Sequence, residues 1–334
     1  MSYQIVLIPG DGIGPEVVRA ARDVVDATGV SIRWSEHMAG ADTHKRCGSP
    51  LPETTLEAVR DAGVALKGPT ATALGSGFRS VNVEMRQKLD LFANYRPARS
   101  MPGTQSRWDD VDVIVIRENT EGLYSGLEHT VVPGVVESLR VITERASQRV
   151  VRFAFETAVH RKRRRVTAVH KANILKMSDG LFLDVARRVA QQYPQIEYDE
   201  CIVDAAAMKL VLDPNQFDVL VMENLFGDII SDLTSGLVGG LGLTPSGNIG
   251  EELAVFEAVH GTAPDIAGRG LANPTALILS AALMLEHLDE RDAAARMYQA
   301  VRAVVARGES VTADLGGAAS TAQFTQAVIA ALNG

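Results

Sequence analysis

Residues 224–233 read Asn-Leu-Phe-Gly-Asp-Ile-Ile-Ser-Asp-Leu and follow an apolar run, 219–222, that is typical of a buried strand. Asp228 and Asp232 are four residues apart, so on a helix their carboxylates lie on one face, one turn apart. An unpaired buried charge is very costly, and a hard divalent cation that takes oxygen ligands would supply a partner for both. Taken alone, the stretch also fits a helix in which Asp228 favours the N-terminus and Asp232 is simply solvated.

The composition is that of an ordinary soluble globular chain. Its 334 residues are enough for two domains or one large α/β unit with an ample core. A net charge of −8 argues against a general nucleic-acid binder, although a locally basic substrate pocket remains possible. The basic run at 160–165 is therefore interpreted as a solvated helix end. The longest apolar helix candidate, Ala276 to Leu285, is too short to span a bilayer, so we expect no membrane partner.

The cysteines and the N-terminus bear on the cell compartment. Cys47 and Cys201 lack metal-type spacing, and two cysteines in a chain of this length indicate reduced thiols rather than a disulfide framework. Residues 1–8 lead straight into a strand pattern without the basic, apolar and small-residue parts of a signal peptide. We therefore expect a cytoplasmic protein.

Three arginines stand near predicted strand ends or helix starts. Arg86 lies in a helix that begins near Ser80, Arg96 follows Asn-Tyr in a short extended segment, and Arg117 ends an apolar strand. Open α/β sheets place their ligands at the carboxyl ends of strands. Several guanidiniums near one crevice would clamp a substrate with two or three carboxylates through bidentate contacts. A lone arginine is more often a surface charge, and a lone Ser80 is more often a helix N-cap.

Other polar residues also follow predicted strands. Lys171 would act as a base if burial lowered its pKa, although a surface lysine is the commoner case. Tyr124 lies in a predicted loop, where it could act as an acid or simply pack. Asp204 ends another short strand, so it joins Asp228 and Asp232 as a third acid at a strand-to-helix junction, where a metal could gather them.

The remaining segments predict loops, an arm and further helices. Residues 71–79 are predicted as a loop, and 125–144 alternate around a Pro-Gly turn, which predicts a hairpin-like arm. Residues 236–250 contain six glycines and show no obvious strand. The segment 255–266 could wrap a nucleotide and is followed by Asn-Pro, which caps a long buried helix. Residues 293–307 are predicted as the final helix.

With these motifs, the chain resembles the decarboxylating β-hydroxyacid dehydrogenases, the family of isocitrate, isopropylmalate and homoisocitrate dehydrogenases. The resemblance runs from Gly10-Asp11-Gly12-Ile13-Gly14 to Asp314-Leu315-Gly316-Gly317, and residues 224–232 are its most specific block. It implies an isocitrate/isopropylmalate dehydrogenase-like α/β fold, unlike the Rossmann type. In that fold one large mixed sheet spans two domains with a central cleft between them.

The resemblance also implies a division into domains and an assembly. Residues 1–98 and 251–334 would form a large, discontinuous, cofactor-binding domain. Residues 99–250 would form a small domain with a dimerisation arm and the metal-binding acids. The protein would be a homodimer or homotetramer with the active site shared between subunits, so that Lys171 and Asp204 serve the cleft of the neighbour.

Each site residue is carried over by its match to the family motifs. The catalytic residues would be Tyr124, as the final proton donor, and Lys171, as the base. The substrate would be bound by Ser80, Asn82, Arg86, Arg96, Arg117 and Asn173. Mg²⁺ or Mn²⁺ would be held by Asp204, Asp228 and Asp232. The cofactor would be bound by Thr72, Glu257, His260, Gly261, Thr262, Ala263, Asp265, Ile266 and Asn273.

The resemblance further implies a substrate. Isopropylmalate enzymes carry a leucine-rich helix before the first arginine, whereas this chain has Ser80-Val81-Asn82, which looks like the isocitrate pattern. A hydroxyl and an amide suit the extra carboxylate of isocitrate and would be left unpaired by an alkyl group. We therefore expect isocitrate, a tricarboxylate, with homoisocitrate or isopropylmalate as the alternative.

The cofactor segment favours NAD. NADP-dependent isocitrate enzymes place Lys and Tyr after the His-Gly-Thr-Ala-Pro run, where this chain has Asp265 and Ile266. An aspartate accepts hydrogen bonds from ribose hydroxyls and repels a 2′-phosphate. The expected reaction is the NAD-dependent, metal-assisted oxidative decarboxylation of isocitrate to 2-oxoglutarate and CO₂. A non-catalytic regulatory subunit of a hetero-oligomeric isocitrate dehydrogenase is the alternative from another class, and it would have lost catalytic positions that this chain keeps.

Overall fold

The protein is described by a computed structural model, which covers residues 2–72 and 79–334. Its strands are β1 Tyr3–Ile8, β2 Ile32–Glu36, β3 Val64–Lys67, β4 Ala93–Arg99, β5 Asp112–Glu118, β6 Gly122–Val132, β7 Val135–Val141, β8 Arg165–His170, β9 Glu197–Ile202, β10 Val219–Met222, β11 Pro245–Ile249 and β12 Ala254–Ala258. Its α-helices are α1 Gly14–Ala27, α2 Ala41–Cys47, α3 Glu53–Ala62, α4 Val81–Lys88, α5 Glu144–His160, α6 Ser178–Ala190, α7 Val203–Leu212, α8 Asn224–Leu237, α9 Thr275–His287, α10 Arg291–Arg307 and α11 Thr321–Asn333.

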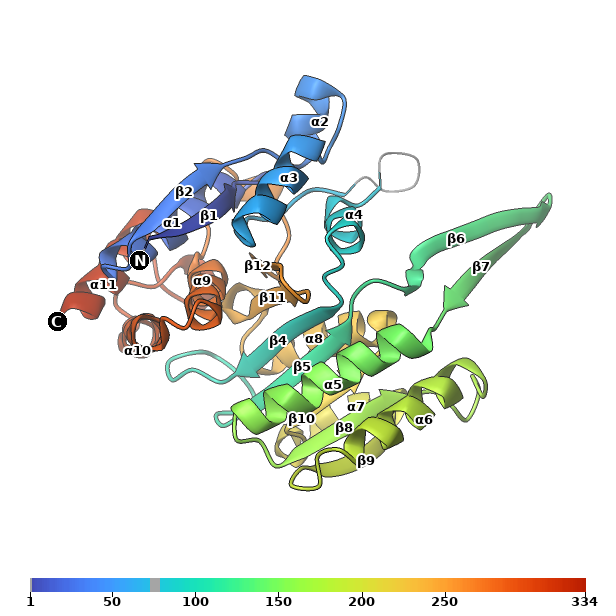
Figure 1. Cartoon of the computed structure of the whole chain (residues 1–334). Coiled ribbons are helices and arrows are strands. Elements are labelled where there is room, and N and C mark those ends of the chain that lie inside the picture. The colour runs from blue at the N-terminus through green and yellow to red at the C-terminus, as the bar shows by residue number, and fades with distance from the viewer. Residues whose placement is uncertain (1, 73–78) are drawn as a thin grey trace.

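One ten-stranded mixed sheet runs through the molecule (Figure 1), in the order β2-β1-β3-β12-β11-β4-β5-β10-β8-β9. The strands β2, β1, β3 and β12 form one parallel block, and β5, β10, β8 and β9 form another. Between them, β11 is antiparallel to both neighbours, and β4 is antiparallel to β5. A mixed sheet of this kind confirms the predicted fold class and differs from the all-parallel Rossmann sheet.

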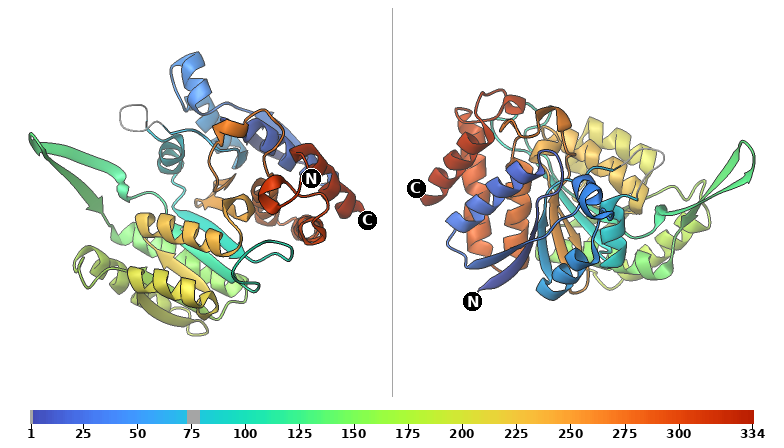
Figure 2. Two further views of the ribbon diagram at one scale, coloured as in Figure 1. Left: turned by 180° about the vertical axis from the view of Figure 1, so that it is seen from behind. Right: turned by 90° about the horizontal axis from the view of Figure 1, so that it is seen from above.

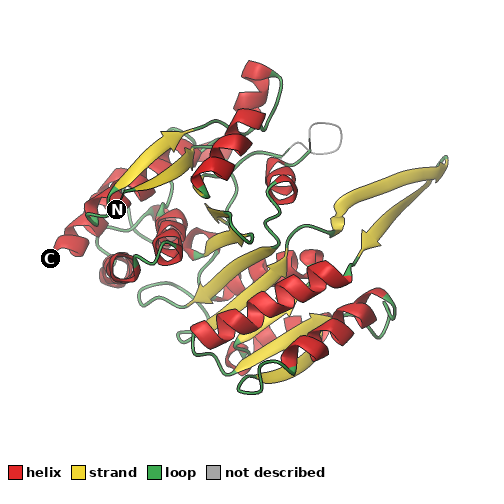
Figure 3. Ribbon diagram, in the orientation of Figure 1, coloured by secondary structure: helices red, strands yellow, loops and turns green. Residues whose placement is uncertain are grey.

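Helices cover both faces of the sheet at each end (Figures 2 and 3). At one end α1, α9, α10 and α11 pack together over the first parallel block, with a core rich in Val, Leu and Ala, while α3 and α4 cover the other face. At the other end α5 and α6 pack on one face and α7 and α8 on the opposite face. Strands buried on both faces explain why β3 and β10 read as continuous apolar runs.

The predicted arm is confirmed as a two-stranded antiparallel ribbon of β6 and β7 that projects away from the body (Figure 1). Its outer part exposes large apolar side chains to solvent: Leu127, Val131, Val132, Val135, Val136 and Leu139. An isolated hairpin is marginally stable in water, and contiguous exposed apolar surface of this kind marks an interaction site.

Several local predictions were wrong or fall outside the described residues. Residues 236–250 do contain a strand, β11, which the glycines concealed. Gly247 is needed there because an added Cβ would lie 2.9 Å from the Phe256 ring. The predicted final helix is followed by another, α11, which starts with a capping box between Ser320 and Gln323. Tyr124 lies on β6 rather than in a loop, and of the predicted loop at 71–79 residues 73–78 lie outside the described part.

No helix among residues 2–72 and 79–334 is long and apolar enough to cross a bilayer. Cys47 is exposed and Cys201 is buried, and both are free thiols.

Candidate active site

A pocket of about 220 Å³ brings together most of the predicted substrate residues. It lies where the ends of β3 and β12 meet β4, β5, α4 and α8. The predicted residues that line it are Ser80, Asn82, Arg86, Arg96, Arg117, Tyr124, Asp228, Glu257, His260 and Gly261. Segments far apart in the chain therefore supply one small polar cavity.

The three arginines reach the pocket from three different elements. Arg86 is on α4, Arg96 on β4 and Arg117 on β5, and all three are buried. The Arg96 Nη1 atom donates to Ser231 Oγ at 2.6 Å and to Asp232 Oδ1 at 3.2 Å. These contacts hold the guanidinium of Arg96 against α8.

Arg117 is anchored to the start of α8. Its Nε donates to Asn224 Oδ1 at 2.9 Å, and its Nη1 donates to Asp228. The helix packs tightly on this side chain, because a Cβ added to Gly227 would lie 2.5 Å from the Arg117 Cβ. The motif at 224–232 thus contains a glycine because an arginine on the neighbouring strand takes the space.

The electrostatics of the pocket favour an anionic ligand. Burial, followed by repulsion from Arg96 and Arg86, lowers the pKa of Arg117 to about 9. Burial and repulsion from Arg86 also lower the pKa of Arg96. Asp228 offsets part of this repulsion, but the pKa of Arg117 stays lowered, so further negative charge in the pocket would stabilise its guanidinium.

Ser80 and Asn82 lie at the start of α4 and face the same pocket. Ser80 occupies the N-cap position, but its side chain makes no capping hydrogen bond, so the simple N-cap interpretation was wrong. Its hydroxyl accepts instead from Thr72 Oγ1 at 3.3 Å, and Asn82 Oδ1 accepts from Thr70 Oγ1 at 3.0 Å. The polar tips of both residues are therefore held by the chain segment after β3.

Asp228 joins the arginines to Tyr124. The Tyr124 hydroxyl donates to Asp228, and the Arg117 guanidinium carbon lies 5.0 Å from the centre of the Tyr124 ring. Burial, together with the bond to Asp228, raises the pKa of Tyr124, so its proton stays on the oxygen at neutral pH. Burial alone would raise the pKa of Asp228, but Arg117 and the Tyr124 hydroxyl outweigh it, so this carboxylate is ionised.

The helix N-cap on α8 is Glu223, whose side chain accepts from the backbone N–H groups of Leu225 and Phe226. The alternative in which Asp228 served the helix N-terminus is therefore wrong. Asp232 lies one turn beyond Asp228 and is half-exposed, with burial raising its pKa. Two carboxylates on one helix face with oxygen-only donors fit part of a site for a hard cation.

The third predicted metal ligand lies elsewhere in this chain. Asp204 is exposed and accepts from Lys171 Nζ. Neither residue, nor Asn173, lines the pocket, and the part of the chain that the structure describes contains no group of three or more acidic, histidine or cysteine side chains placed to hold a metal. A cation held by Asp228 and Asp232 would therefore need further ligands from a substrate or a second chain.

The segment after β12 contains most of the predicted cofactor residues. His260 and Gly261 line the pocket, and burial lowers the pKa of His260, which keeps its ring neutral at neutral pH. Ile13 N donates to the carbonyl of Thr262 at 2.9 Å, which ties this loop to the turn before α1. Asp265 and Ile266 follow in a short 3-10 turn, Pro264–Ile266, with no buried side chain.

Several predicted cofactor residues have structural partners. Ala263 has a positive φ of 38° and starts the 3-10 turn. Asn273 lies one residue before Pro274, the N-cap of α9; its Oδ1 accepts from Thr275 N at 3.0 Å, and its Nδ2 donates to Asp314. The Glu257 carboxylate is buried and bound by Lys67 Nζ at 2.7 Å and Arg86 Nη2 at 3.1 Å. A cofactor role for these residues stays a prediction.

The comparisons with known proteins agree with this site. The family model described as isocitrate/isopropylmalate dehydrogenase matches residues 4–328. The chain belongs to this family. It is a dehydrogenase of the decarboxylating kind that the family comprises. The crystal structure of isocitrate dehydrogenase from Methylococcus capsulatus superposes on this dehydrogenase with a TM-score of 0.97, at 51% identity and covering 99% of this chain and 100% of that one.

Two curated relatives are equally similar in sequence and differ in substrate. The NAD isocitrate dehydrogenase catalytic subunit 5 of Arabidopsis thaliana is 55% identical over 96% of this dehydrogenase and 86% of the relative. The 3-isopropylmalate dehydrogenase of Solanum tuberosum is 55% identical over 91% of this dehydrogenase and 85% of the relative. Overall identity therefore does not separate the two substrates.

The relatives correct the expected compartment. The Arabidopsis isocitrate dehydrogenase subunits are mitochondrial proteins, and so are the animal and yeast subunits of about 50% identity, which contradicts the prediction of a cytoplasmic protein. That prediction rested on the two cysteines, interpreted as reduced thiols, and on the strand pattern at residues 1–8. A targeting segment is no part of the fold, so residues 1–8 do not decide the compartment.

Several buried polar side chains that bind the site residues of this dehydrogenase were not predicted from the sequence. Lys67, Asn94 and Asn248 are buried and bond directly to residues of the pocket or to one another. A lysine that ends the apolar run 64–67 was a usable signal, because a charge in a fully buried strand needs a partner. The asparagines gave no such signal, since their partners depend on strand pairing.

Proposed function

We propose that this dehydrogenase catalyses the NAD-dependent oxidative decarboxylation of isocitrate to 2-oxoglutarate and CO₂, assisted by Mg²⁺ or Mn²⁺. The observation that carries the proposal is the convergence of three buried guanidiniums with Ser80 and Asn82 in one pocket. Such a pocket is complementary to a small molecule with several carboxylates.

The choice of isocitrate over isopropylmalate rests on two polar side chains at the start of α4. Ser80 and Asn82 present a hydroxyl and an amide to the pocket, and both are polarised by neighbouring threonine hydroxyls. A carboxylate would pair with these groups, whereas an isopropyl group would leave them desolvated and unpaired. A site built for polar groups discriminates strongly against an analogue that lacks them. Ser80 and Asn82 therefore favour isocitrate, although the two relatives with different substrates are both 55% identical to this chain.

The residues of the pocket would share the work of binding and proton transfer. Arg86, Arg96 and Arg117 would orient the carboxylates, and Tyr124 would keep a proton on its oxygen for delivery to carbon. Lys171 of the partner subunit would take the proton of the substrate hydroxyl at its Nζ.

Two groups would complete the site. Asp228 and Asp232, with Asp204 of the partner subunit, would hold the cation. When bound, the cation would polarise the oxygen at the reacting carbon, and NAD would take up the two electrons of the oxidation.

A second copy of the chain is the proposed partner, in a homodimer or homotetramer. The arm exposes large apolar side chains. Further exposed apolar side chains lie on α7, α8 and the segment after β8, namely Ile174, Met177, Met208, Leu212 and Ile229. Lys171, Asn173 and Asp204, on or next to the same segments, are predicted site residues that do not line the pocket of their own chain. An interface here would cover the apolar surface and complete a neighbour's site in one step.

The proposed domain division places residues 1–98 and 251–334 in one domain and 99–250 in the other. Separate apolar cores at the two ends of the sheet support it. NAD rather than NADP is supported by Asp265, which would repel a 2′-phosphate. The alternative of a non-catalytic subunit is disfavoured because Tyr124, Lys171 and the acids and arginines of the predicted site are all present.

The proposal is tested by following NADH, CO₂ and 2-oxoglutarate during incubation of the purified protein with isocitrate and Mg²⁺. We expect the three products in equal amounts. Exhaustive treatment with a chelator should abolish turnover, and Mg²⁺ or Mn²⁺ should restore it. Absence of turnover from the homo-oligomer with both metals and both cofactors would overturn the proposal, and full activity after chelation would overturn the role of the metal.

A further inference from the structure

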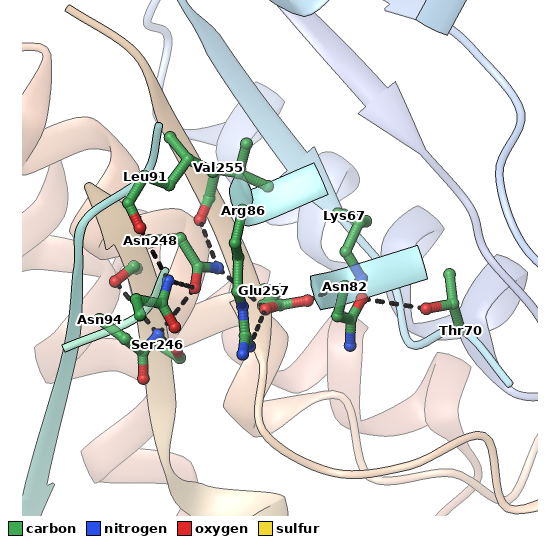
Figure 4. Close-up of polar contacts among 12 residues, drawn as sticks. Lys67, Thr70, Asn82, Arg86, Leu91, Asn94, Ser246, Asn248, Val255 and Glu257 are labelled. Atoms are coloured by element: carbon green, nitrogen blue, oxygen red, sulfur yellow. Dashed lines mark hydrogen bonds and ion pairs between the residues drawn. The ribbon is translucent and has the colours of Figure 1, made fainter. Parts of the chain in front are cut away.

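A continuous line of buried side chains joins two of the pocket arginines, and Figure 4 shows the part of it that runs from Arg86 through Glu257 and Asn248 to Asn94. Arg86 Nη2 donates to Glu257 Oε1 at 3.1 Å, and Asn248 Nδ2 donates to the same oxygen at 2.9 Å. Asn94 Nδ2 then donates to Asn248 Oδ1 at 2.9 Å, and Arg96 Nε donates to Asn94 Oδ1 at 2.6 Å. The line therefore runs from one guanidinium to the other through three side chains that are all buried.

The hydrogen bonds along this line allow only one orientation of the Asn248 amide. Asn248 Oδ1 accepts from Asn119 Nδ2 at 3.0 Å as well as from Asn94, and Asn248 Nδ2 also donates to the Val255 carbonyl at 3.2 Å. A reversed amide would place its oxygen against the Glu257 carboxylate and its NH₂ group against two other NH₂ groups. Both contacts would be repulsive and buried, so the amide of Asn248 is locked in place.

The backbone beneath the line is equally well defined. Asn248 is on β11, the antiparallel strand between the two blocks of the sheet, and it stands directly opposite Asn94 on β4 and Val255 on β12. At the far end, Lys67 Nζ holds the second oxygen of Glu257 at 2.7 Å. Three paired strands and a buried ion pair thus hold Asn94, Asn248 and Glu257, the three side chains between the arginines, in place.

We infer that Asn248 is a positioning residue that fixes the relative placement of the Arg86 and Arg96 guanidiniums for the carboxylates of one substrate. The inference rests on the proposed function, because it takes those arginines to bind substrate. Asn248 does not line the pocket, so it acts through Glu257 and Asn94. Side chains that hold contact residues in a fixed geometry commonly matter as much as the contacts.

The test compares Asn248→Ala with Asn119→Ala. Asn119 is as buried as Asn248 and bonds to it and to the Leu91 carbonyl, but it stands outside the line between the arginines. Both variants remove one buried amide, and Asn248→Ala should lower the melting temperature more, because the Asn248 side chain makes four hydrogen bonds and that of Asn119 makes two. Only Asn248→Ala should raise the KM for isocitrate, by roughly tenfold, with a much smaller change in kcat, because the arginines bind substrate and transition state alike.

A second readout needs no substrate. Hydrogen exchange at Arg96 Nε, followed by NMR, should be slow in the wild type and in Asn119→Ala and at least about tenfold faster in Asn248→Ala. Asn94→Ala breaks the same line one bond further along and gives the same test if Asn248→Ala does not fold.

The two readouts separate this inference from the proposed function. Equal KM and equal exchange in the Asn248 and Asn119 variants would refute the positioning role while leaving isocitrate turnover intact. Faster exchange only in the Asn248 variant, in a protein whose wild type does not turn over isocitrate, would refute the proposed function and keep the coupling of the arginines.

Discussion

Replacing Glu257 with glutamine would remove one buried negative charge and keep the shape of the side chain. The Glu257 side chain is only 6% exposed, and it faces Lys67, 1% exposed, at 2.7 Å and Arg86, 9% exposed, at 3.1 Å. One carboxylate is therefore the shared ion-pair partner of two buried cations. Removing one partner of a buried ion pair leaves an uncompensated charge and costs about 3–5 kcal/mol.

The assay is the melting temperature at fixed protein concentration, measured by calorimetry. About 2 °C is lost per kcal/mol in a chain of this length, so Glu257→Gln should melt roughly 6–10 °C below the wild type. The matched double variant combines Glu257→Gln with Lys67→Met. It removes the lysine charge that Glu257→Gln leaves unpaired, and it should recover at least half of the lost melting temperature. A single variant within about 2 °C of the wild type, or a double variant no more stable than the single one, would refute the reasoning.

We also expect the stability difference between the wild type and Glu257→Gln to depend on pH. Burial alone would raise the pKa of Glu257, but Lys67 and Arg86 outweigh it, so the pKa in the folded protein lies below its ordinary value of 4.5. A depressed carboxyl pKa stabilises the folded state fully above the unfolded value and less as the pH falls further. The gap in melting temperature between wild type and Glu257→Gln should therefore be constant above pH 4.5 and shrink below it. A gap that widens in acid would contradict this assignment.

Two further predictions concern the partner subunit and the cofactor. Lys171→Ala and Arg96→Ala should each be nearly inactive, and co-refolding should restore activity at roughly a quarter of the sites, because mixed dimers contain one site with both residues; no recovery in mixed dimers shown to form would place Lys171 in its own subunit's cleft. Asp265→Lys combined with Ile266→Tyr should raise the ratio of kcat/KM for NADP to that for NAD by about ten- to a hundredfold, and a wild type that already prefers NADP would overturn the choice of NAD.

The fold class could be predicted from the sequence because different motifs of the family are spread along nearly the whole chain. The prediction failed locally where tertiary contacts override propensity. Pro245 and Gly247 argue against a strand, yet β11 forms because two neighbouring strands supply its hydrogen bonds and Phe256 fills the space beside the glycine. The helix α11 was missed after a run of glycines, although Ser320 and Gln323 carry a recognisable capping box.

Site residues could be predicted from the sequence where a charged side chain stands next to a strand. They could not be predicted where their contacts depend on how two strands pair. Arg96 and Arg117 were identified because a charge beside an apolar strand is conspicuous. The link between Asn94 and Asn248 joins residues 154 positions apart, and only the pairing of β4 with β11 brings them together. The place of Lys171 could not be read from one chain, because its proposed cleft belongs to another subunit.

The most direct test of the proposed substrate is the ratio of kcat/KM for isocitrate to that for isopropylmalate, with homoisocitrate as a third substrate, at saturating NAD and Mg²⁺. We expect isocitrate to be preferred over both. Asn82→Leu should lower the value for isocitrate by about tenfold or more and leave that for isopropylmalate unchanged or higher, because it removes a polar partner of the extra carboxylate. A wild type that turns over isopropylmalate more efficiently than isocitrate would contradict the interpretation of this pocket as a tricarboxylate site formed by the three arginines, Ser80 and Asn82.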